Sequence, residues 1–285
     1  MTRSPSVSTR IPHIASHRLQ LRKWTDGEGI AREAYQTARR LLVGSLATHT
    51  AAPLAYAAAM DSKPFRTKNL TALTKKGFKV SKGLPMKREG IVKVRPHAEI
   101  AARLMALQAV FLWTSFGEEN LASKRLEAYV KRSSLEKWMT KDEKAILKTT
   151  RAKAHAAHGD SIGWRLENMW PLAWVLGMKK APACDGKMID DKTIEAILFE
   201  LLPGPEESAL DFVKQTKVRT LAEVAALEDL FYCAHNAVRS AQLGGKTVPK
   251  GFDPVGNGGV IHERRQALTW ALSPGDAWDD TDLST

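Results

Sequence analysis

The sequence predicts an all-α protein: a multi-helix, bundle-like single domain preceded by a basic N-terminal extension. Three observations support this fold class. Apolar residues recur every three or four positions in several long segments, which is typical of helices that bury one face. Thr-x-x-Glu motifs at Thr140 and Thr220 indicate helix starts, and no convincing alternation of apolar and polar residues follows residue 96. The expected division is an extension over residues 1–65 and a helical domain over residues 66–285.

Composition bounds the class of protein. A chain of 285 residues, of which 44% are hydrophobic, can bury a sizeable core. No run of about 18 uncharged apolar residues occurs, so no membrane-spanning helix is expected. The cysteines, Cys184 and Cys233, have no metal-type spacing and indicate no disulfide framework. We therefore expect a cytoplasmic protein with no membrane partner, no metal and no cofactor.

Positive charge is concentrated in the front third of the chain. The formal net charge is +12, and residues 66–95 carry ten Lys or Arg residues against the single acid Glu89. Residues 96–285 are nearly neutral, with 24 basic and 26 acidic residues. This distribution favours anionic partners or acidic protein surfaces. If the basic segment acts on its own, removing residues 1–95 should leave the body folded.

The first elements are the least regular. Residues 1–25 are rich in Ser and Arg, and they are consistent with either an organelle-targeting segment or a disordered arm. Residues 27–60 are expected to be helical, with a break at Pro53. Residues 61–95 contain several glycines and are expected to form loops around a short helix.

From Pro96 onward the pattern is strongly helical. Pro96 suits the first position of a helix, and Thr140 begins another. Trp170 and Trp174 are four residues apart, which indicates core packing on one helix face, and Gly177 is expected to end that helix. Two short helices are expected over residues 190–200 and 205–214. The clearest helix begins at Thr220 and stops before two glycines, with one apolar face: Leu221, Val224, Leu227, Phe231, Ala234, Val238 and Ala241.

A polar stripe accompanies that apolar face. Glu228, Tyr232, His235 and Arg239 lie at i, i+4, i+7 and i+11, so they share one side of the helix. A carboxylate, a phenol, an imidazole and a guanidinium in this pattern could serve acid–base chemistry or anion binding. The other interpretation is a half-buried stripe that a neighbouring helix satisfies, and we favour it.

The last helix places Arg264 among apolar residues, on the face formed by Val260, Ala267, Leu268 and Ala271. A guanidinium in a core needs a carboxylate, because an unpaired buried charge costs several kcal/mol. The candidate partners are Asp229, Glu167, Asp279 and Asp280. We expect a polar lock between Arg264 and the acids of the C-terminal segment, Asp279 and Asp280, or another carboxylate of the body, with Trp278 as its apolar plug.

Several segments resemble the domain of unknown function 4272 family, which is found mainly in bacteria. They are "RTKNLTALTKKGFKVSKGLP", "EIAARLMAL", "ENMWPLAWVLG", "DLFYCAHNAVRSAQL" and "GVIHERRQALTWAL…WDDTDLST", within residues 66–285. The family's motifs correspond here to His235, Ala237, Arg239, Glu263, Arg264, Ala267, Leu268 and Trp270. Cys233 and Asn236 depart from them, standing where arginine and tryptophan are common. The resemblance implies an architecture more than an activity.

The leading functional hypothesis is a non-enzymatic bacterial protein-binding module, of which a toxin-neutralising (immunity-type) protein is one form. Its partner is then another protein. Its candidate binding residues are Glu228, Tyr232, His235, Arg239, Arg264, Trp270 and Trp278.

Two alternatives belong to other classes of protein. One is a hydrolase that uses His235 with Glu263 or Asp279. The other is a nucleic-acid-associated protein that binds through residues 66–95, where Phe78 is the only aromatic residue available for base stacking.

Overall fold

A computed structural model of the chain describes residues 63–86 and 93–285. The helix expected over residues 27–60 and the two interpretations of residues 1–25 lie outside this part. The described residues form ten α-helices with no strand, which confirms the all-α, single-domain prediction. No described helix combines the length and the apolar character needed to cross a membrane.

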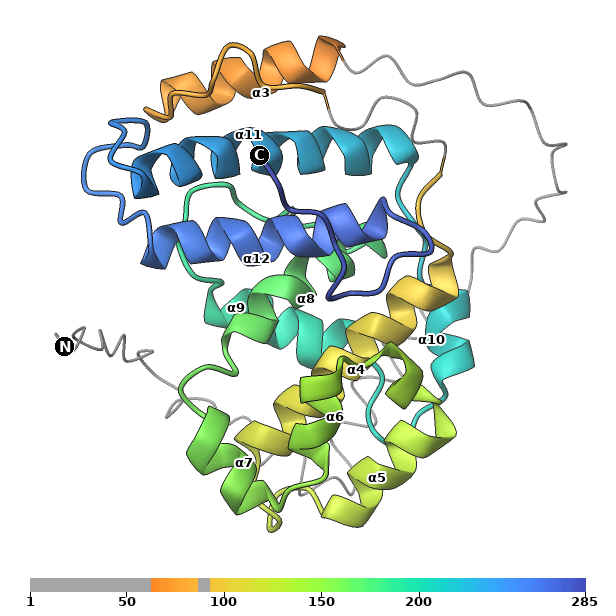
Figure 1. Cartoon of the computed structure of the whole chain (residues 1–285). Coiled ribbons are helices and arrows are strands. Elements are labelled where there is room, and N and C mark those ends of the chain that lie inside the picture. Colours follow the sequence, from red (N-terminus) through yellow and green to blue (C-terminus); the bar gives the residue numbers. More distant parts are fainter. Residues whose placement is uncertain (1–62, 87–92) are drawn as a thin grey trace, which may run out of the picture.

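The helices pack as a continuous stack. In Figure 1, α3, α11 and α12 lie one below the other, α8 packs beneath α12, and α4 runs obliquely from α8 into a lower group of helices. The main helices are α3 (Lys63–Lys75), α4 (His97–Ser115), α5 (Ser123–Arg132), α6 (Lys141–Leu147), α7 (Arg151–His158), α8 (Trp164–Val175), α10 (Ala209–Gln215), α11 (Leu221–Gln242) and α12 (Gly256–Ala271).

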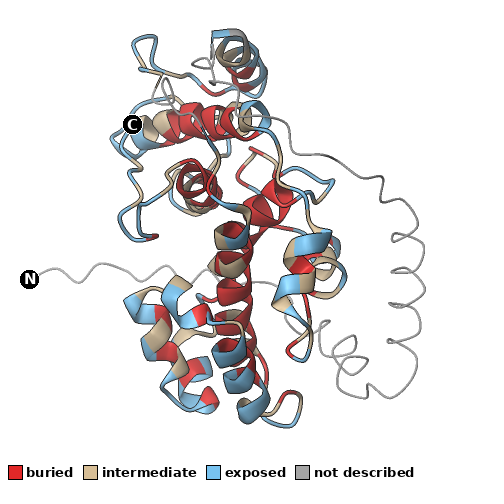
Figure 2. Ribbon diagram, turned by 90° about the vertical axis from the view of Figure 1, so that its right-hand side faces the viewer, coloured by how far each residue is buried: buried red, intermediate tan, exposed pale blue. Residues whose placement is uncertain are grey.

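Helix α4 forms the centre of the molecule. It is apolar around most of its circumference, as expected of a helix with neighbours on all sides. It packs against α5, α6, α7, α8 and α10. Figure 2 shows buried residues running through the middle of the molecule, while the lower helices keep exposed outer faces.

Helix boundaries follow local rules read from the sequence. Thr140 and Thr220 each accept a hydrogen bond from the backbone N–H three residues on, in complete capping boxes. Gly177 has a φ of +105° and follows the end of α8, a conformation that favours glycine. Pro96 is not the first helical residue but the one before it, since α4 begins at His97.

The two short helices are only partly as expected. In the first region α9 (Asp191–Glu195) continues directly into a π-helical turn (Ala196–Leu201), so the segment reaches residue 201 in two forms. In the second, α10 begins at Ala209, because Ser208 caps it through the backbone N–H of Asp211. The preceding residues form a turn.

The basic segment is part of the body. Leu73 on α3 is fully buried and Phe78 is 2% exposed, and each such side chain contributes about 1.5–3 kcal/mol on burial. Arg66 donates to the carboxylate of Asp229 on α11 at 2.7 Å. This burial argues against the expectation that residues 1–95 can be removed without unfolding the body, because the removal would take core side chains with it.

Candidate functional site

The polar stripe of α11 is mostly buried at the junction with α12. Glu228, Tyr232 and His235 are at most 4% exposed, whereas Arg239, one turn further on, is exposed. The first three surround Arg265 of α12, which is itself fully buried. The favoured interpretation, a stripe satisfied by a neighbouring helix, agrees with this arrangement.

Arg265 is the hub of this polar junction. Its Nη1 lies 2.6 Å from Nδ1 of His235, and its Nε lies 3.7 Å from a carboxylate oxygen of Glu228. Its guanidinium also lies 4.8 Å from the centre of the Tyr232 ring, a cation–π contact. The same guanidinium donates to the backbone carbonyls of Leu283 and Ser284 at 2.8 and 3.2 Å, so it fastens the C-terminal segment to α12.

The contact with Arg265 fixes the protonation of His235. A guanidinium can only donate, so Nδ1 of His235 must accept and the imidazole is neutral, with its proton on Nε2. Nε2 then faces Nδ1 of His262 at 3.4 Å. Burial, with the positive charge of Arg265, lowers the pKa of His235 to about 3. The basic nitrogen of His235 is thus occupied by an arginine.

The proposed catalytic partners of His235 lie elsewhere. Glu263 is half-buried and accepts from the side chain of Asn168 at 2.9 Å, while Asp279 is exposed. In the described part of the chain, neither forms a hydrogen bond or ion pair with His235. The structure therefore does not bring these three predicted residues together.

Arg264 is a buried structural anchor, as the sequence indicates. Its Nε donates to Oε2 of Glu167 on α8 at 2.7 Å, and both side chains are fully buried. The remaining donors reach the carbonyls of Ala183 and Lys187 at 2.6 and 2.8 Å. Glu167 in turn accepts from the backbone N–H of Ile189 at 2.8 Å. The pair joins α12, α8 and the loop after α8.

The expected lock between Arg264 and the acids of the C-terminal segment is wrong. Of the four candidate partners, Glu167 is the correct one. Asp229 is instead paired with Arg66, and both Asp279 and Asp280 are exposed. Asp279 and Asp280 therefore do not pair with Arg264.

Arginines and the Trp278 side chain hold the C-terminal segment. Trp278 is 6% exposed and packs against Trp270 with ring centres 5.4 Å apart. The guanidinium of Arg103 lies 4.1 Å from the Trp278 ring, and that of Arg95 lies 4.0 Å from the Trp270 ring. Arg95 also donates to the carbonyls of Trp270, Ser273 and Asp276. Trp278 is thus the apolar plug that was expected, with a different set of polar partners.

Arg103 is a second anchor that the sequence reasoning missed. It binds Glu143 through both terminal nitrogens, at 2.5 and 2.9 Å, and both side chains are fully buried. Glu143 is also the capping-box residue of α6. The available signal was Arg103 itself, a charge inside the otherwise apolar run Ile100–Leu107 of α4.

A surface patch, rather than the polar junction, presents charged and apolar side chains to solvent. The backbone N–H of Lys79 donates to the carbonyl of Thr247 at 2.8 Å, which places residues 75–82 beside the loop between α11 and α12 (Figure 1). Two exposed apolar residues lie at the ends of that loop: Leu243 is 86% exposed and Val255 is 75% exposed. We name these two residues and six exposed lysines the docking patch; the lysines are Lys75, Lys76, Lys79, Lys82, Lys246 and Lys250.

Other side chains of the described residues that could react or bind a metal lie in unfavourable surroundings for it. Burial raises the pKa of both cysteine thiols, Cys184 and Cys233, to about 12. No three His, Cys, Asp or Glu residues of that part are grouped to hold a metal ion.

Comparison with known proteins places the chain in a family. The model of a domain of unknown function, DUF4272, matches residues 66–281. The chain belongs to the DUF4272 family. No curated protein and no solved structure matches it. The match begins at Arg66, which in this DUF4272 domain is one of two residues of α3, with Asn69, that bind Asp229 of α11.

Proposed function

We propose that this DUF4272 domain is a non-enzymatic protein-binding module and that the docking patch contacts its partner. The observation that carries the proposal is the pairing of two exposed apolar residues, Leu243 and Val255, with six exposed lysines on neighbouring segments. Exposed apolar side chains rimmed by polar ones are typical of protein interfaces. The lysines favour a partner with an acidic surface, which they would attract before contact.

The patch is held in shape before any partner binds. Thr247 donates through its hydroxyl to the carbonyl of Ala237 at 2.6 Å, and Gln242 donates to the carbonyl of Pro254 at 2.9 Å. Asp253 accepts from the backbone N–H groups of Val255 and Gly256 at 3.0 and 2.9 Å. A loop ordered in advance loses less conformational entropy on binding, which supports a recognition role.

The lysines also favour a second candidate, a nucleic-acid-binding protein. Phe78 argues against it, because this aromatic ring of the basic segment is 2% exposed and packs edge-on against Phe252. A buried ring offers no face for base stacking. Exposed leucine and valine side chains beside the lysines suit a protein surface better than a phosphate backbone.

The narrower form of the proposal is a toxin-neutralising protein of the bacterial cytoplasm. Its support is the sequence resemblance to a mainly bacterial family, together with the acidic partner that the lysines favour. An immunity protein binds its toxin directly. The same experiment therefore tests both forms, and the identity of the captured partner separates them.

Affinity capture from nuclease-treated lysate of the source cells tests the proposal. The patch variant is Leu243→Ser with Lys246→Glu and Lys250→Glu. A matched control, Leu210→Ser with Lys131→Glu and Lys192→Glu, makes the same changes on exposed residues outside the patch. We expect one partner to bind the parent and the control, and the patch variant to retain at least about tenfold less, a loss of roughly 1.4 kcal/mol.

Two results would contradict the proposal. One is equal capture of every partner by the patch variant. The other is binding of labelled DNA or RNA that falls steeply with salt and disappears in the patch variant, which would establish the nucleic-acid alternative.

A further inference from the structure

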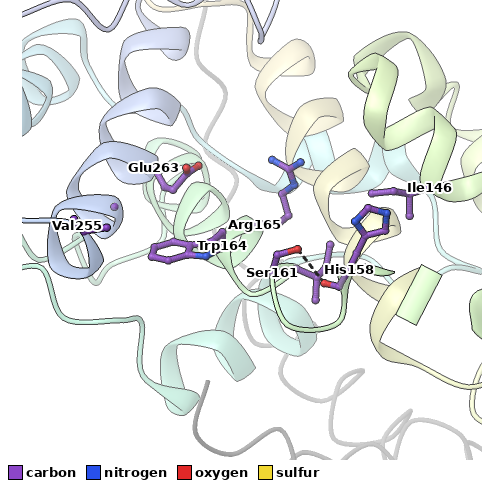
Figure 3. A pocket seen from close by; sticks show the side chains of 9 residues that line it. Ile146, His158, Ser161, Trp164, Arg165, Val255 and Glu263 are labelled. Carbon is purple, nitrogen blue, oxygen red and sulfur yellow. Dashed lines mark hydrogen bonds between the residues drawn. The ribbon is translucent and has the colours of Figure 1, made fainter. Parts of the chain in front are cut away.

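A groove that shares Val255 with the docking patch but contains none of its lysines lies where α7, α8 and α12 meet. It encloses about 300 Å³. Helix α8 supplies Trp164 and Arg165, α12 supplies Glu263, and the turn after α7 supplies Ser161 (Figure 3). The volume is at the lower end of the range of ligand pockets and corresponds to about ten water molecules.

Arg165 offers unused hydrogen-bond donors to this groove. Its side chain is 28% exposed, and its Nε forms an ion pair with Oε1 of Glu143 at 3.6 Å, a separation beyond hydrogen-bond distance. Glu143 is already bound by both terminal nitrogens of Arg103. Arg165 forms no side-chain hydrogen bond with the described residues. Its planar guanidinium is thus available to a carboxylate.

Glu263 offers the opposite charge. Its Oε2 accepts from Asn168 at 2.9 Å, which fixes the side chain, while Oε1 has no hydrogen-bond partner among the described residues. Glu263 forms no ion pair with Arg165, although both line the same groove. The half-buried carboxylate is thus fixed by Asn168 and the half-buried guanidinium is paired with Glu143, so the two line the groove without forming an ion pair with each other.

Trp164 supplies an apolar wall of the groove. A Cβ added to Gly259 would lie 3.0 Å from Cη2 of the Trp164 ring, closer than such contacts normally come. The glycine thus allows α12 to approach the indole. Ile162, buried at the same site, extends the apolar lining.

We infer that this groove binds a small zwitterionic ligand, an amino acid or dipeptide with an apolar side chain. The ligand's carboxylate binds Arg165, its ammonium group binds Glu263, and its side chain packs on Trp164. The volume admits either a free amino acid or a dipeptide. Both ligands share a carboxylate, an ammonium group and an apolar side chain.

Isothermal titration of the full chain with L-leucine and with Leu-Leu tests the inference. Leucine amide lacks the carboxylate and N-acetyl-leucine lacks the ammonium group, so each should bind at least about tenfold more weakly than leucine. Leu-Leu blocked at its carboxylate or at its ammonium group gives the same comparison for the dipeptide. Tighter binding of leucine identifies a free amino acid as the source, and tighter binding of Leu-Leu identifies a peptide.

Protein variants complete the test. Arg165→Gln and Glu263→Gln should each weaken binding at least about tenfold, whereas Arg165→Lys should restore part of it and keep the parent's melting behaviour. The matched controls are Lys131→Gln and Glu127→Gln on the exposed face of α5. No binding of either ligand up to about 10 mM overturns the inference. The inference is also overturned if blocking either end of the ligand leaves the affinity unchanged, or if both groove variants bind as tightly as the parent.

The groove shares Val255 with the docking patch, but the two tests substitute different residues. None of these variants changes a lysine of the patch or Leu243. Loss of partner capture with intact ligand binding would count against the proposed function alone. Loss of ligand binding with intact capture would count against the groove alone.

Discussion

Replacing Arg264 with alanine is expected to lower the free energy of unfolding by about 3–5 kcal/mol. The substitution leaves Glu167 buried with no cation and removes the donors to the carbonyls of Ala183 and Lys187. Burial raises the pKa of Glu167, and Arg264 opposes that rise. Against a typical total of about 5–15 kcal/mol, the loss is large enough to unfold a marginal domain.

Denaturant melts of four proteins measure this effect: the parent, Arg264→Ala, Glu167→Gln and the double variant. The double variant should lose less than the sum of the single losses, because each single change already breaks the same pair. Arg125→Ala is the matched control, since it breaks the exposed pair with Glu206, and it should cost at most about 1 kcal/mol. An Arg264→Ala protein as stable as this control would contradict the anchor role.

Ending the chain after Pro274 is expected to cost at least about 3–5 kcal/mol, the usual cost of losing a buried tryptophan. The shortened protein lacks Trp278, which packs on Trp270 and faces Arg103. It also lacks the carbonyls of Leu283 and Ser284 that accept from Arg265. Thermal melts of the shortened and full chains measure the loss.

Proteins that combine this truncation with an arginine substitution show which arginine holds the C-terminal segment. Arg264 shares no hydrogen-bond partner with residues 275–285, so its alanine variant and the truncation should add within about 0.5 kcal/mol. Arg265→Ala and the truncation should cost less together than the sum of their separate effects. The opposite pattern is a combined loss smaller than the sum for Arg264 and an additive loss for Arg265. It would mean that Arg264 holds the C-terminal segment, as the sequence predicts.

Local signals made much of the fold predictable. The capping boxes at Thr140 and Thr220 and the glycine stop at Gly177 depend on residues within one turn, so the sequence contains them entirely. The spacing of Trp170 and Trp174 also indicated their burial correctly, at 3% and 7% exposed. The need of Arg264 for a carboxylate followed from elementary electrostatics.

Pairings between distant segments were not predictable in the same way. Arg264 and Arg265 point about 100° apart on a helix, and both are buried because α12 packs between α8 and α11. A single sequence indicates one buried face but does not show that a helix has two neighbours. The contact of Lys79 with Thr247, which assembles the docking patch, likewise depends on the packing of α3 against α11.

The protonation state of His235 tests most directly whether the polar stripe of α11 serves structure. NMR of the imidazole carbon and nitrogen shifts, followed from about pH 8 to about pH 5, reports it. With a pKa of about 3, the His235 ring should keep the shifts of a neutral, Nε2-protonated imidazole throughout. The unfolded chain in denaturant is the control, since its histidines have the ordinary pKa of about 6.5. A His235 ring that titrates between about pH 6 and 7 in the folded protein would contradict its role as an acceptor for Arg265 and would restore it as a candidate general base.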